Sequence, residues 1–334
     1  MTTLVTGATG FTGINIVRTL AEAGEAVIAL GHRPPSPECH QFLGGLEAKV
    51  RFLVGDVLDT ASMLSLAESN AVQRFVHTAA ITPSGNVEQS IPQHVINVNL
   101  MGTVSMLEVA RKVSAKRFVF TSSSGVYGAP KDRTELVRED SPLQLNSLYT
   151  ICKYACELLL KRYKSLFGLS TVAGRMTAIY GPMERATASR GQPSTIYKVV
   201  SALLARRTIK ARGREFVRDY THVEDASSIW RHLSLASDLG HDVYNVSAGV
   251  TYSLGEVLET LHELDPTFGY SYAASDQDAD VEITPEGERG ALDITKVSTE
   301  FGFSPKYDLK QGIESYLEWA REYPTLFPTG EDWK

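Results

Sequence analysis

Tyr149 and Lys153 are the residues whose types and spacing point most directly to proton transfer. They lie four positions apart in the sequence Tyr-Thr-Ile-Cys-Lys, so in a helix their side chains share one face. A free tyrosine has a pKa of about 10, and about 4 kcal/mol of preference for the phenolate is needed to bring it to about 7. One ammonium about 4 Å away supplies roughly that much at an effective dielectric constant of about 20. The pair therefore predicts a general acid and base for a hydroxyl or carbonyl group, with an ordinary surface helix as the alternative.

Three consecutive serines follow an apolar run in the sequence FTSSSGVYG, which begins at Phe120. The run predicts a strand, and ligands of open α/β sheets bind at the carboxyl ends of strands. We expect one serine to hold the substrate oxygen beside the tyrosine. For any single serine, the alternative is a hydroxyl-rich turn without a ligand.

A ladder of glycines follows the first apolar run in the sequence LVTGATGFTG, at Gly7, Gly10 and Gly13. These glycines lie between an expected strand and an expected helix, where the first N–H groups of the helix and its dipole can hold an anion. Glycine also lets the backbone approach a pyrophosphate and lets helix pack on strand. The spacing is G-x-x-G-x-x-G and not the usual G-x-G-x-x-G, so a tight turn without a ligand is the alternative. The position after the first strand favours a dinucleotide site.

The end of the second expected strand indicates which dinucleotide binds. NAD-binding proteins of this type carry an acidic residue there for the ribose hydroxyls. The sequence VIALGHRPP offers Gly31, His32 and Arg33 instead, and Arg33 has the charge to pair with a 2′-phosphate. We therefore expect NADP or NAD, with a preference for NADP; a solvated Arg33 is the alternative.

These residues need elements that bring them together, and the pattern of the chain predicts such elements. Short apolar strands alternate with amphipathic helices as far as the sequence STVAGRMTAIYGP, which we interpret as one strand ending in a Gly-Pro break. This alternation predicts an α/β fold, a Rossmann-type doubly wound parallel sheet with a smaller C-terminal substrate-binding domain. We expect residues 1–180, with about 220–250, to form the NAD(P)-binding domain. Residues 181–219 and 251–328 are expected to form the substrate domain.

The composition excludes several classes of protein. The 334 residues carry a net charge of −6 with dispersed basic residues, so a nucleic-acid partner is not expected. No apolar run approaches the ~20 residues of a membrane span, and no leader segment is visible. Three cysteines fit a reducing compartment, so we expect a cytoplasmic protein in which Cys152 and Cys156 are packed thiols. The eight histidines lack metal-ligand spacing, so no metal is expected.

Taken together, the motifs resemble the extended short-chain dehydrogenase/reductase family, the NAD-dependent epimerase/dehydratase group. The similarity covers roughly residues 1 to 250 and runs in family order through TGATGFTG, GDV, HTAA, NVNLMGT, TSSSGVYG, YTICK, IYGP and RDYTHVEDA. The last 80 or so residues match only loosely. The resemblance implies a carbohydrate-metabolising enzyme with Ser123 as the catalytic hydroxyl, Tyr149 as acid and base, and Lys153 on the nicotinamide ribose. It also implies that Asp225 holds a domain junction.

Resemblance and residue patterns together assign two sets of binding residues. The cofactor set is Gly7, Gly10, Phe11, Thr12, Gly13, Arg33, Asp56, Val57, Thr78, Ala79, Ala80, Asn99, Thr121, Tyr149, Lys153 and Ile179. The substrate set is Ser123, Ser124, Tyr149, Arg185 and Arg289. Arg185 and Arg190 lie in the polar loop after Pro182, where they either meet an anionic group of a substrate or are solvated.

Departures from the family pattern bear on the reaction. Family dehydratases carry an Asp-Glu pair where this chain has Ser124 and Gly125, so dehydration is disfavoured. Nucleotide-sugar epimerases usually carry an Asn where this chain has Ala178. We therefore expect an NAD(P)-dependent oxidoreductase that moves a hydride at a secondary hydroxyl of a sugar, sugar acid or similar small hydroxy compound. The alternative is a nucleotide-sugar epimerase similar to UDP-glucose 4-epimerase.

Two further expectations concern partners. A non-catalytic NADP sensor is a weaker hypothesis, because the family's sensors typically lose the Tyr–Lys pair that this chain keeps. The resemblance also implies a homodimer formed through the helices around Asn99–Lys112 and Tyr149–Phe167. The second helix is apolar on more than one face, which fits burial against both a sheet and a partner.

Overall fold

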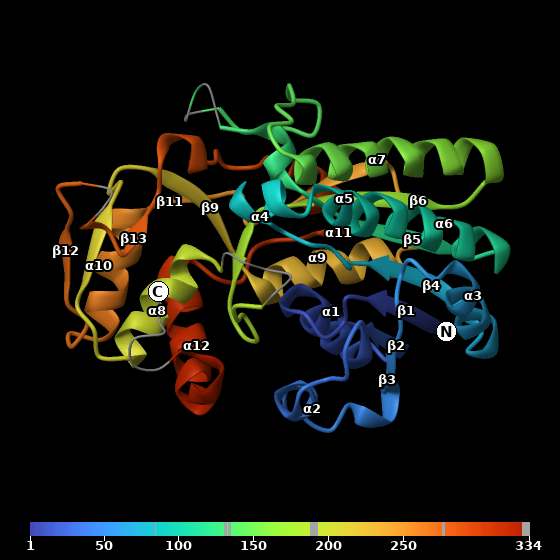
Figure 1. Ribbon diagram of the computed structural model, residues 1–334, viewed down its shortest axis with the longest axis horizontal. Coiled ribbons are helices and arrows are strands. Elements are labelled where there is room, and N and C mark those ends of the chain that lie inside the picture. Colours follow the sequence, from blue (N-terminus) through green and yellow to red (C-terminus); the bar gives the residue numbers. More distant parts are fainter. Residues whose placement is uncertain (84, 130–131, 133–134, 188–192, 276–277, 329–334) are drawn as a thin grey trace.

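The centre of the molecule is a seven-stranded sheet, seen in the computed structural model of Figure 1. The structure describes residues 1–83, 85–129, 132, 135–187, 193–275 and 278–328. The strand order is β10-β6-β5-β4-β1-β2-β3, and every neighbouring pair is parallel. The strands are β1 (Thr2–Thr6), β2 (Ala26–Gly31), β3 (Val50–Val54), β4 (Val72–His77), β5 (Arg117–Ser123), β6 (Thr171–Met176) and β10 (Val243–Val246). The order reverses between β1 and β4, which is the doubly wound topology that the sequence predicts.

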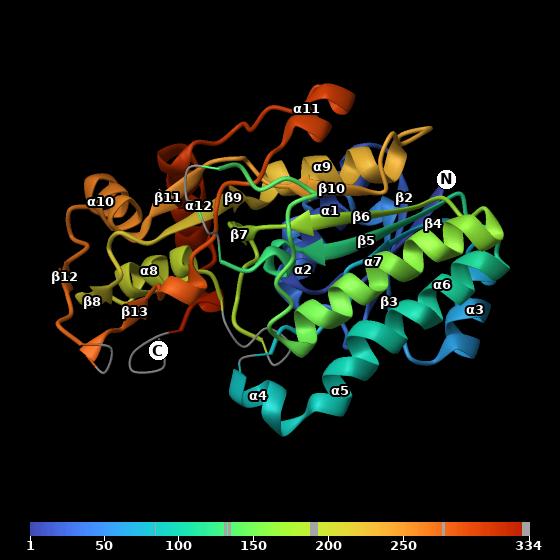
Figure 2. The ribbon, with the colours of Figure 1, turned by 90° about the horizontal axis from the view of Figure 1, so that it is seen from above.

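Helices cover both faces of this sheet, and Figure 2 shows the two layers. One face packs on α1 (Phe11–Glu22) and α9 (Val223–Leu235), with α2 (Pro37–Leu43) and α11 (Thr295–Phe301) at its edges. The other face packs on α3 (Thr60–Ser69), α6 (Gly102–Lys112) and α7 (Leu148–Phe167). Close approach has a local cause at Gly174 on β6, where a Cβ would lie 2.3 Å from the ring of Trp230 on α9. The predicted fold class is confirmed.

Several short elements lie at the rim of the sheet. A single π turn, η2 (Asn97–Met101), joins α5 (Pro92–Ile96) to α6, so the helix expected around Asn99–Lys112 begins in a π turn. The others are α4 (Gly85–Ser90), η1 (Glu47–Lys49) and η3 (Ser124–Tyr127). The helix α2 was not expected from the sequence, in which Pro34 and Pro35 precede it, Pro37 is its first residue and two glycines follow it.

The expected single strand over STVAGRMTAIYGP is in fact two strands in different sheets. Thr177 divides β6 from β7 (Ala178–Tyr180). Its N–H donates to the carbonyl of Val246 and its hydroxyl to the carbonyl of Asp219, at 3.2 and 2.8 Å. β7 therefore leaves the main sheet and pairs with β9 (Val217–His222), in the order β11-β9-β7 with β11 (Thr251–Ser253).

A second hydrophobic core lies beside the main sheet. It is formed by helices α8 (Thr195–Leu204), α10 (Leu254–Leu264) and α12 (Leu309–Glu322) with a small sheet of order β12-β8-β13. Its strands are β8 (Ile209–Arg212), β12 (Tyr270–Tyr272) and β13 (Val281–Glu282), and two single turns follow, η5 (Pro285–Gly287) and η6 (Pro324–Leu326). Asp225, at the start of α9, accepts hydrogen bonds from the backbone N–H groups of Lys306 and Tyr307 just before α12. The exact division into two domains stays a prediction.

Candidate active site

The position of Tyr149 is fixed by the way α7 begins. Ser147 caps the helix: its hydroxyl accepts from the N–H of Thr150, while the Thr150 hydroxyl accepts from the N–H of Ser147, both at 3.2 Å. This reciprocal cap satisfies two N–H groups at once and fixes the first helical turn. Tyr149 therefore lies in that turn, and Lys153 lies one turn later on the same face.

Lys153 is buried between the end of β5 and the tyrosine ring. Its Nζ donates to the carbonyl of Thr121 at 2.7 Å and lies 5.5 Å from the centroid of the Tyr149 ring. The same ammonium lies 4.6 Å from the centroid of the Phe120 ring. Burial disfavours its charged form and lowers its pKa to about 8. The two residues that the spacing paired are therefore neighbours in space.

The three serines have three different surroundings. Ser123 lines the same cavity as Tyr149, and its hydroxyl accepts from the N–H of Gly125 at 3.1 Å. The hydroxyl of Ser122 is turned away and donates to Glu157 at 2.5 Å. Ser124 is buried and does not line the cavity. Ser122 also lines the cavity, but its hydroxyl is engaged by Glu157, so Ser123 stays the candidate for contact with a substrate oxygen.

A cavity of about 770 Å³ runs from the glycine turn to Tyr149. It collects most of the predicted binding residues: Gly7, Gly10, Phe11, Thr12, Gly13, Arg33, Asp56, Val57, Thr78, Ala79, Ala80, Thr121, Ser123, Tyr149, Lys153, Ile179 and Arg185. Asn99, Ser124 and Arg289 do not line it, and Arg190 lies outside the described residues. Sequence reasoning named His32 without giving it a role, and it did not assign the polar lining residues Thr9, Ser36, Thr82, His94, Thr177 and Thr187.

The three glycines serve two different purposes. A Cβ on Gly13 would lie 2.2 Å from the carbonyl oxygen of Gly7, and one on Gly7 would lie 2.9 Å from the backbone of Ala79. These two glycines are required because α1 and the segment after β4 pack closely on the turn. A Cβ on Gly10 would meet only one atom within 4 Å, on the side of the turn that lines the cavity. Gly10 is also the N-cap of α1 and provides no side-chain cap, so the N-terminal N–H groups suit an anion such as the pyrophosphate of a dinucleotide.

Asn99 does not line the cavity but hydrogen-bonds to the backbone of a residue that does. It is buried, its Oδ1 accepts from the N–H of Ile81 and its Nδ2 donates to the carbonyl of Ile81, both at 2.9 Å. Ile81 itself lines the cavity. The amide therefore fixes the backbone that follows Thr78–Ala80, and it does not face the cavity itself.

A buried ion pair lies directly behind the serines. Arg175 on β6 contacts Glu157 on α7 through Nε and Nη2, with the shortest distance 2.7 Å, and both side chains are 4% exposed. Its Nη1 donates to the hydroxyl of Tyr127 on η3. Because Glu157 also accepts from Ser122, the pair joins α7, β6 and the turn that carries Ser123.

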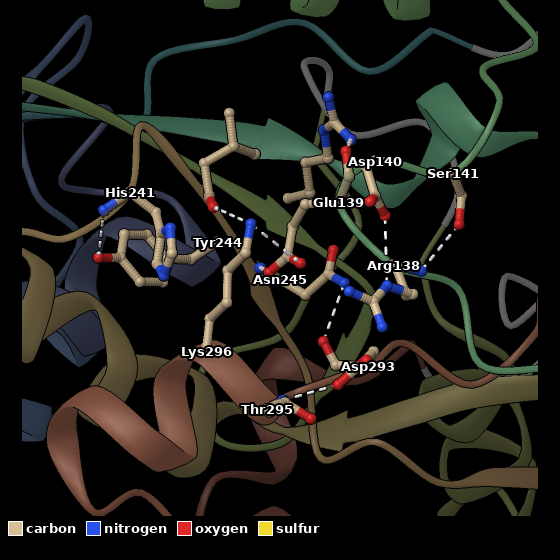
Figure 3. Close-up of polar contacts among 12 residues, drawn as sticks. Arg138, Glu139, Asp140, Ser141, His241, Tyr244, Asn245, Asp293, Thr295 and Lys296 are labelled. Carbon is tan, nitrogen blue, oxygen red and sulfur yellow. Dashed lines mark hydrogen bonds and ion pairs between the residues drawn. The ribbon is translucent and has the colours of Figure 1, made fainter.

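The segment that leads to Tyr149 is anchored by a second network, shown in Figure 3. Glu139 accepts from the backbone N–H of Asn245 at 3.0 Å and pairs with Lys296 on α11 at 3.3 Å. The side-chain amide of Asn245 donates to the carbonyls of Val137 and Asp293. The segment around Val137 and Glu139 is therefore held against β10 and the start of α11, which lie more than 100 residues later in the sequence.

Three cations gather at the junction of the small sheets. Arg218 lies on β9, Lys198 on α8, and the N–H of Arg289 donates to the carbonyl of Val217 at 3.1 Å. Burial, and secondly the charge of Arg218, lowers the pKa of Lys198 and of Arg289. Among the described residues none of the three has a carboxylate within ion-pair distance; the two guanidinium groups donate to the backbone carbonyls of residues 286–288.

Comparison with known proteins decides the family. The model of the NAD dependent epimerase/dehydratase family matches residues 3–247. The chain belongs to this family. It is therefore an enzyme of the extended short-chain dehydrogenase type that works by hydride transfer with a nicotinamide coenzyme.

Similar family members are found across nearly the whole chain. A UDP-glucose 4-epimerase of Mycolicibacterium smegmatis is 29% identical over 327 residues, which cover 96% of this chain and 99% of that protein. A UDP-glucuronate 4-epimerase of Thermodesulfobacterium geofontis is 24% identical, with 96% of each chain covered. Among solved structures, the UDP-glucose 4-epimerase of Thermus thermophilus in complex with NAD has a TM-score of 0.81 and 25% identity, covering 96% of this chain and 99% of that one.

The described residues form neither a metal-binding cluster nor a membrane-spanning helix. In the part of the chain that the structure describes, no group of three or more His, Cys, Asp or Glu side chains is arranged to hold a metal ion. No helix within those ranges is long and apolar enough to span a membrane.

Proposed function

We propose that this family member is a nucleotide-sugar epimerase, which oxidises a secondary hydroxyl of a nucleoside-diphosphate sugar and returns the hydride to the opposite face. The observation that carries the proposal is the cluster of Lys198, Arg218 and Arg289, in which Arg218 lies on β9, the strand that pairs with the cavity-lining part of β7. The similarity to UDP-sugar 4-epimerases over nearly the full length of both chains supports it.

The cluster has the charge and position of a diphosphate site. Ala178 on β7 lines the cavity and pairs with Tyr220 on β9. Arg218 lies two residues before Tyr220 on the same strand. Three partly buried cations without carboxylate partners among the described residues are costly, because each loses hydration without a counter-charge. A diphosphate supplies two negative charges and several acceptors for charge-assisted hydrogen bonds.

The side chains of the site support acid–base chemistry at a carbinol. Tyr149 removes the hydroxyl proton, and Ser123 donates a hydrogen bond to the oxygen as it becomes a carbonyl. Lys153 holds a positive charge beside the phenol, which favours the phenolate. A nicotinamide coenzyme held along the glycine turn would supply the acceptor and later the donor of the hydride. For epimerisation the keto sugar must turn within the cavity before Tyr149 returns the proton.

A dehydrogenase of a sugar or sugar acid is the second candidate. It is favoured by Ala178, which lines the cavity at the position where epimerases of the family usually carry an asparagine. In that case the reduced coenzyme leaves the enzyme after each turnover.

One experiment separates the two. The purified protein is incubated with UDP-hexoses, UDP-hexuronic acids, dTDP-sugars, free sugar acids and polyols, with NAD or NADP. Isomerised nucleotide sugar without net accumulation of reduced nicotinamide is expected. Stoichiometric reduced nicotinamide identifies a dehydrogenase, and turnover of free sugars alone contradicts the diphosphate assignment.

For the coenzyme we propose that NADP is accepted and preferred. The end of β2 carries Gly31, His32 and the exposed Arg33, and a Cβ on Gly31 would lie 2.7 Å from the Thr9 side chain, which leaves no room for an aspartate. The solved relatives with bound NAD argue for NAD. Dissociation constants of both coenzymes, for the native protein and Arg33→Ala, test the preference: tighter NAD binding by the native protein contradicts it.

We also propose a homodimer formed through α7 and η2. Met101, Ile151, Leu158, Leu166 and Phe167 are each about half exposed there, between 46% and 53%. Ile151 and Leu158 lie seven positions apart and so share a face of α7. Figures 1 and 2 show α6 and α7 side by side along one side of the molecule.

A further inference from the structure

Arg185 emerges from a segment that is anchored on both sides. The amide of Asn15 on α1 donates to the carbonyls of Phe11 and Pro182, both at 2.9 Å, which ties the Gly-Pro break to the first turn of α1. Glu184, which is fully buried, accepts from the N–H and the hydroxyl of Ser194 at the start of α8. Arg185 therefore starts from a fixed position beside the glycine turn.

The guanidinium of Arg185 reaches into the cavity across that turn. Its Nη2 donates to the carbonyl of Thr9 at 2.9 Å, between Gly7 and Gly10. Its Nη1 is buried and has no hydrogen-bond partner among the described residues. A hydrogen bond from Ser36 is the main cause of the lowered pKa of Glu38, and the charge of Arg185 adds a smaller effect, yet no described carboxylate lies within ion-pair distance of Arg185. Burying such a donor unpaired is unfavourable unless an acceptor arrives.

The surroundings identify the chemistry of that acceptor. Arg185 shares the cavity with Gly10, Phe11 and Thr12, at the uncapped N-terminus of α1, and with Arg33 at the end of β2. The two arginines and the N–H groups at the start of α1 supply donors and positive charge here, so an anionic oxygen is favoured. A dinucleotide presents phosphate oxygens here, in its pyrophosphate and, for NADP, in its 2′-phosphate.

We propose that Arg185 binds a phosphate group of the coenzyme through Nη1, closing over the glycine turn from the segment after β7. This role differs from contact with an anionic group of the substrate. It rests on the coenzyme site of the proposed function but not on the identity of the sugar.

The test measures binding by calorimetry, without turnover, for the native protein, Arg185→Met, Arg185→Lys and the control Arg214→Met, whose arginine is 61% exposed. The probes are NAD, NADP and adenosine. We expect Arg185→Met to weaken coenzyme binding about 10- to 100-fold, Arg185→Lys to restore part of it, and adenosine binding to stay unchanged.

The pattern of losses identifies the phosphate. Equal losses for NAD and NADP identify the pyrophosphate, and a loss confined to NADP identifies the 2′-phosphate. The proposal is overturned if Arg185→Met binds both coenzymes like the native protein, or if adenosine binding falls by the same factor. A failure of the nucleotide-sugar assignment would leave these constants untouched, so the two proposals fail separately.

Discussion

At the scale of single residues, Lys153 shows how a site is assembled at a cost to stability. Its ammonium is buried, and that burial lowers its pKa to about 8. Below pH 8 the folded chain therefore holds a charge that prefers water. As pH rises from about 8 to 10.5, the unfolded chain keeps this proton longer than the folded chain, so the contribution of Lys153 to the free energy of unfolding becomes more favourable.

We predict that Lys153→Met lowers kcat by about 10²- to 10⁴-fold, the range for loss of acid–base assistance. The same variant gains stability relative to the native protein at pH 7, and the gain shrinks by about 2 kcal/mol at pH 10. Urea unfolding at both pH values measures this difference. A gain that grows with pH would show that the lysine is not penalised by burial.

Arg289 and Arg218 carry the prediction for the substrate. If they bind a diphosphate, Arg289→Met raises KM for a UDP-sugar about 10- to 100-fold, because a charge-assisted hydrogen bond is lost. The dissociation constant of the coenzyme stays unchanged. Arg212→Met, on an exposed pair with Glu282, is the matched control. An unchanged KM in the Arg289 variant would remove the argument for a nucleotide substrate.

Local spacing made part of the site predictable from sequence. Tyr149 and Lys153 share a helix face, and the glycines follow the first strand. Both arrangements follow from spacing within one short segment, and all of these residues line the cavity. Arg218 and Lys198 were missed, as was the pairing of Glu139 with Lys296, because their contacts join segments far apart in sequence. A charged residue gives no sequence signal of lacking a partner.

At the scale of elements, the Arg175–Glu157 pair holds α7 and β6 in register with the serine turn. We predict that Arg175→Met alone destabilises the protein by about 3 to 5 kcal/mol, because Glu157 is left buried without its partner. The double variant with Glu157→Met should recover much of this loss. Urea unfolding of the native protein, both single variants and the double variant measures the coupling, and strictly additive losses would contradict it.

Gly312 determines how closely α12 approaches β7. A Cβ at this position would lie 2.0 Å from the hydroxyl oxygen of Tyr180. Although alanine favours a helix by about 1 kcal/mol over glycine, we predict that Gly312→Ala destabilises the protein by about 1 to 3 kcal/mol through overpacking.

The control for Gly312 is the same substitution in a Tyr180→Phe background, which removes the nearest clashing atom. There the loss in thermal or urea stability should be smaller. An equal loss in both backgrounds would place the strain elsewhere along α12.

At the scale of the whole molecule, the fold class follows from alternating apolar strands and amphipathic helices. Parallel strands need helical crossovers, and buried strands read as short apolar runs. The strands of one smaller sheet could not be predicted in this way, because β8, β12 and β13 are two to four residues long and too short to show a hydrophobic pattern. β7 could not be predicted either, because the hydrogen bonds of Thr177 that end β6 join residues distant in sequence.

The exposed apolar residues of α7 bear on whether two copies of the chain associate. Leu158 is 53% exposed at the middle of α7, on the face it shares with Ile151, whereas Val250, 46% exposed, lies outside the helices proposed for the interface. If two copies pack through α7 and η2, Leu158→Glu places two carboxylates in a buried, apolar contact, where an unpaired charge is strongly disfavoured. Sedimentation at micromolar concentration should then give twice the chain mass for the native protein and for Val250→Glu, and the single chain mass for Leu158→Glu. Coenzyme binding by the variant should persist, since Leu158 does not line the cavity. A native protein of single chain mass, or a Leu158→Glu variant of double mass, would exclude this surface as the interface.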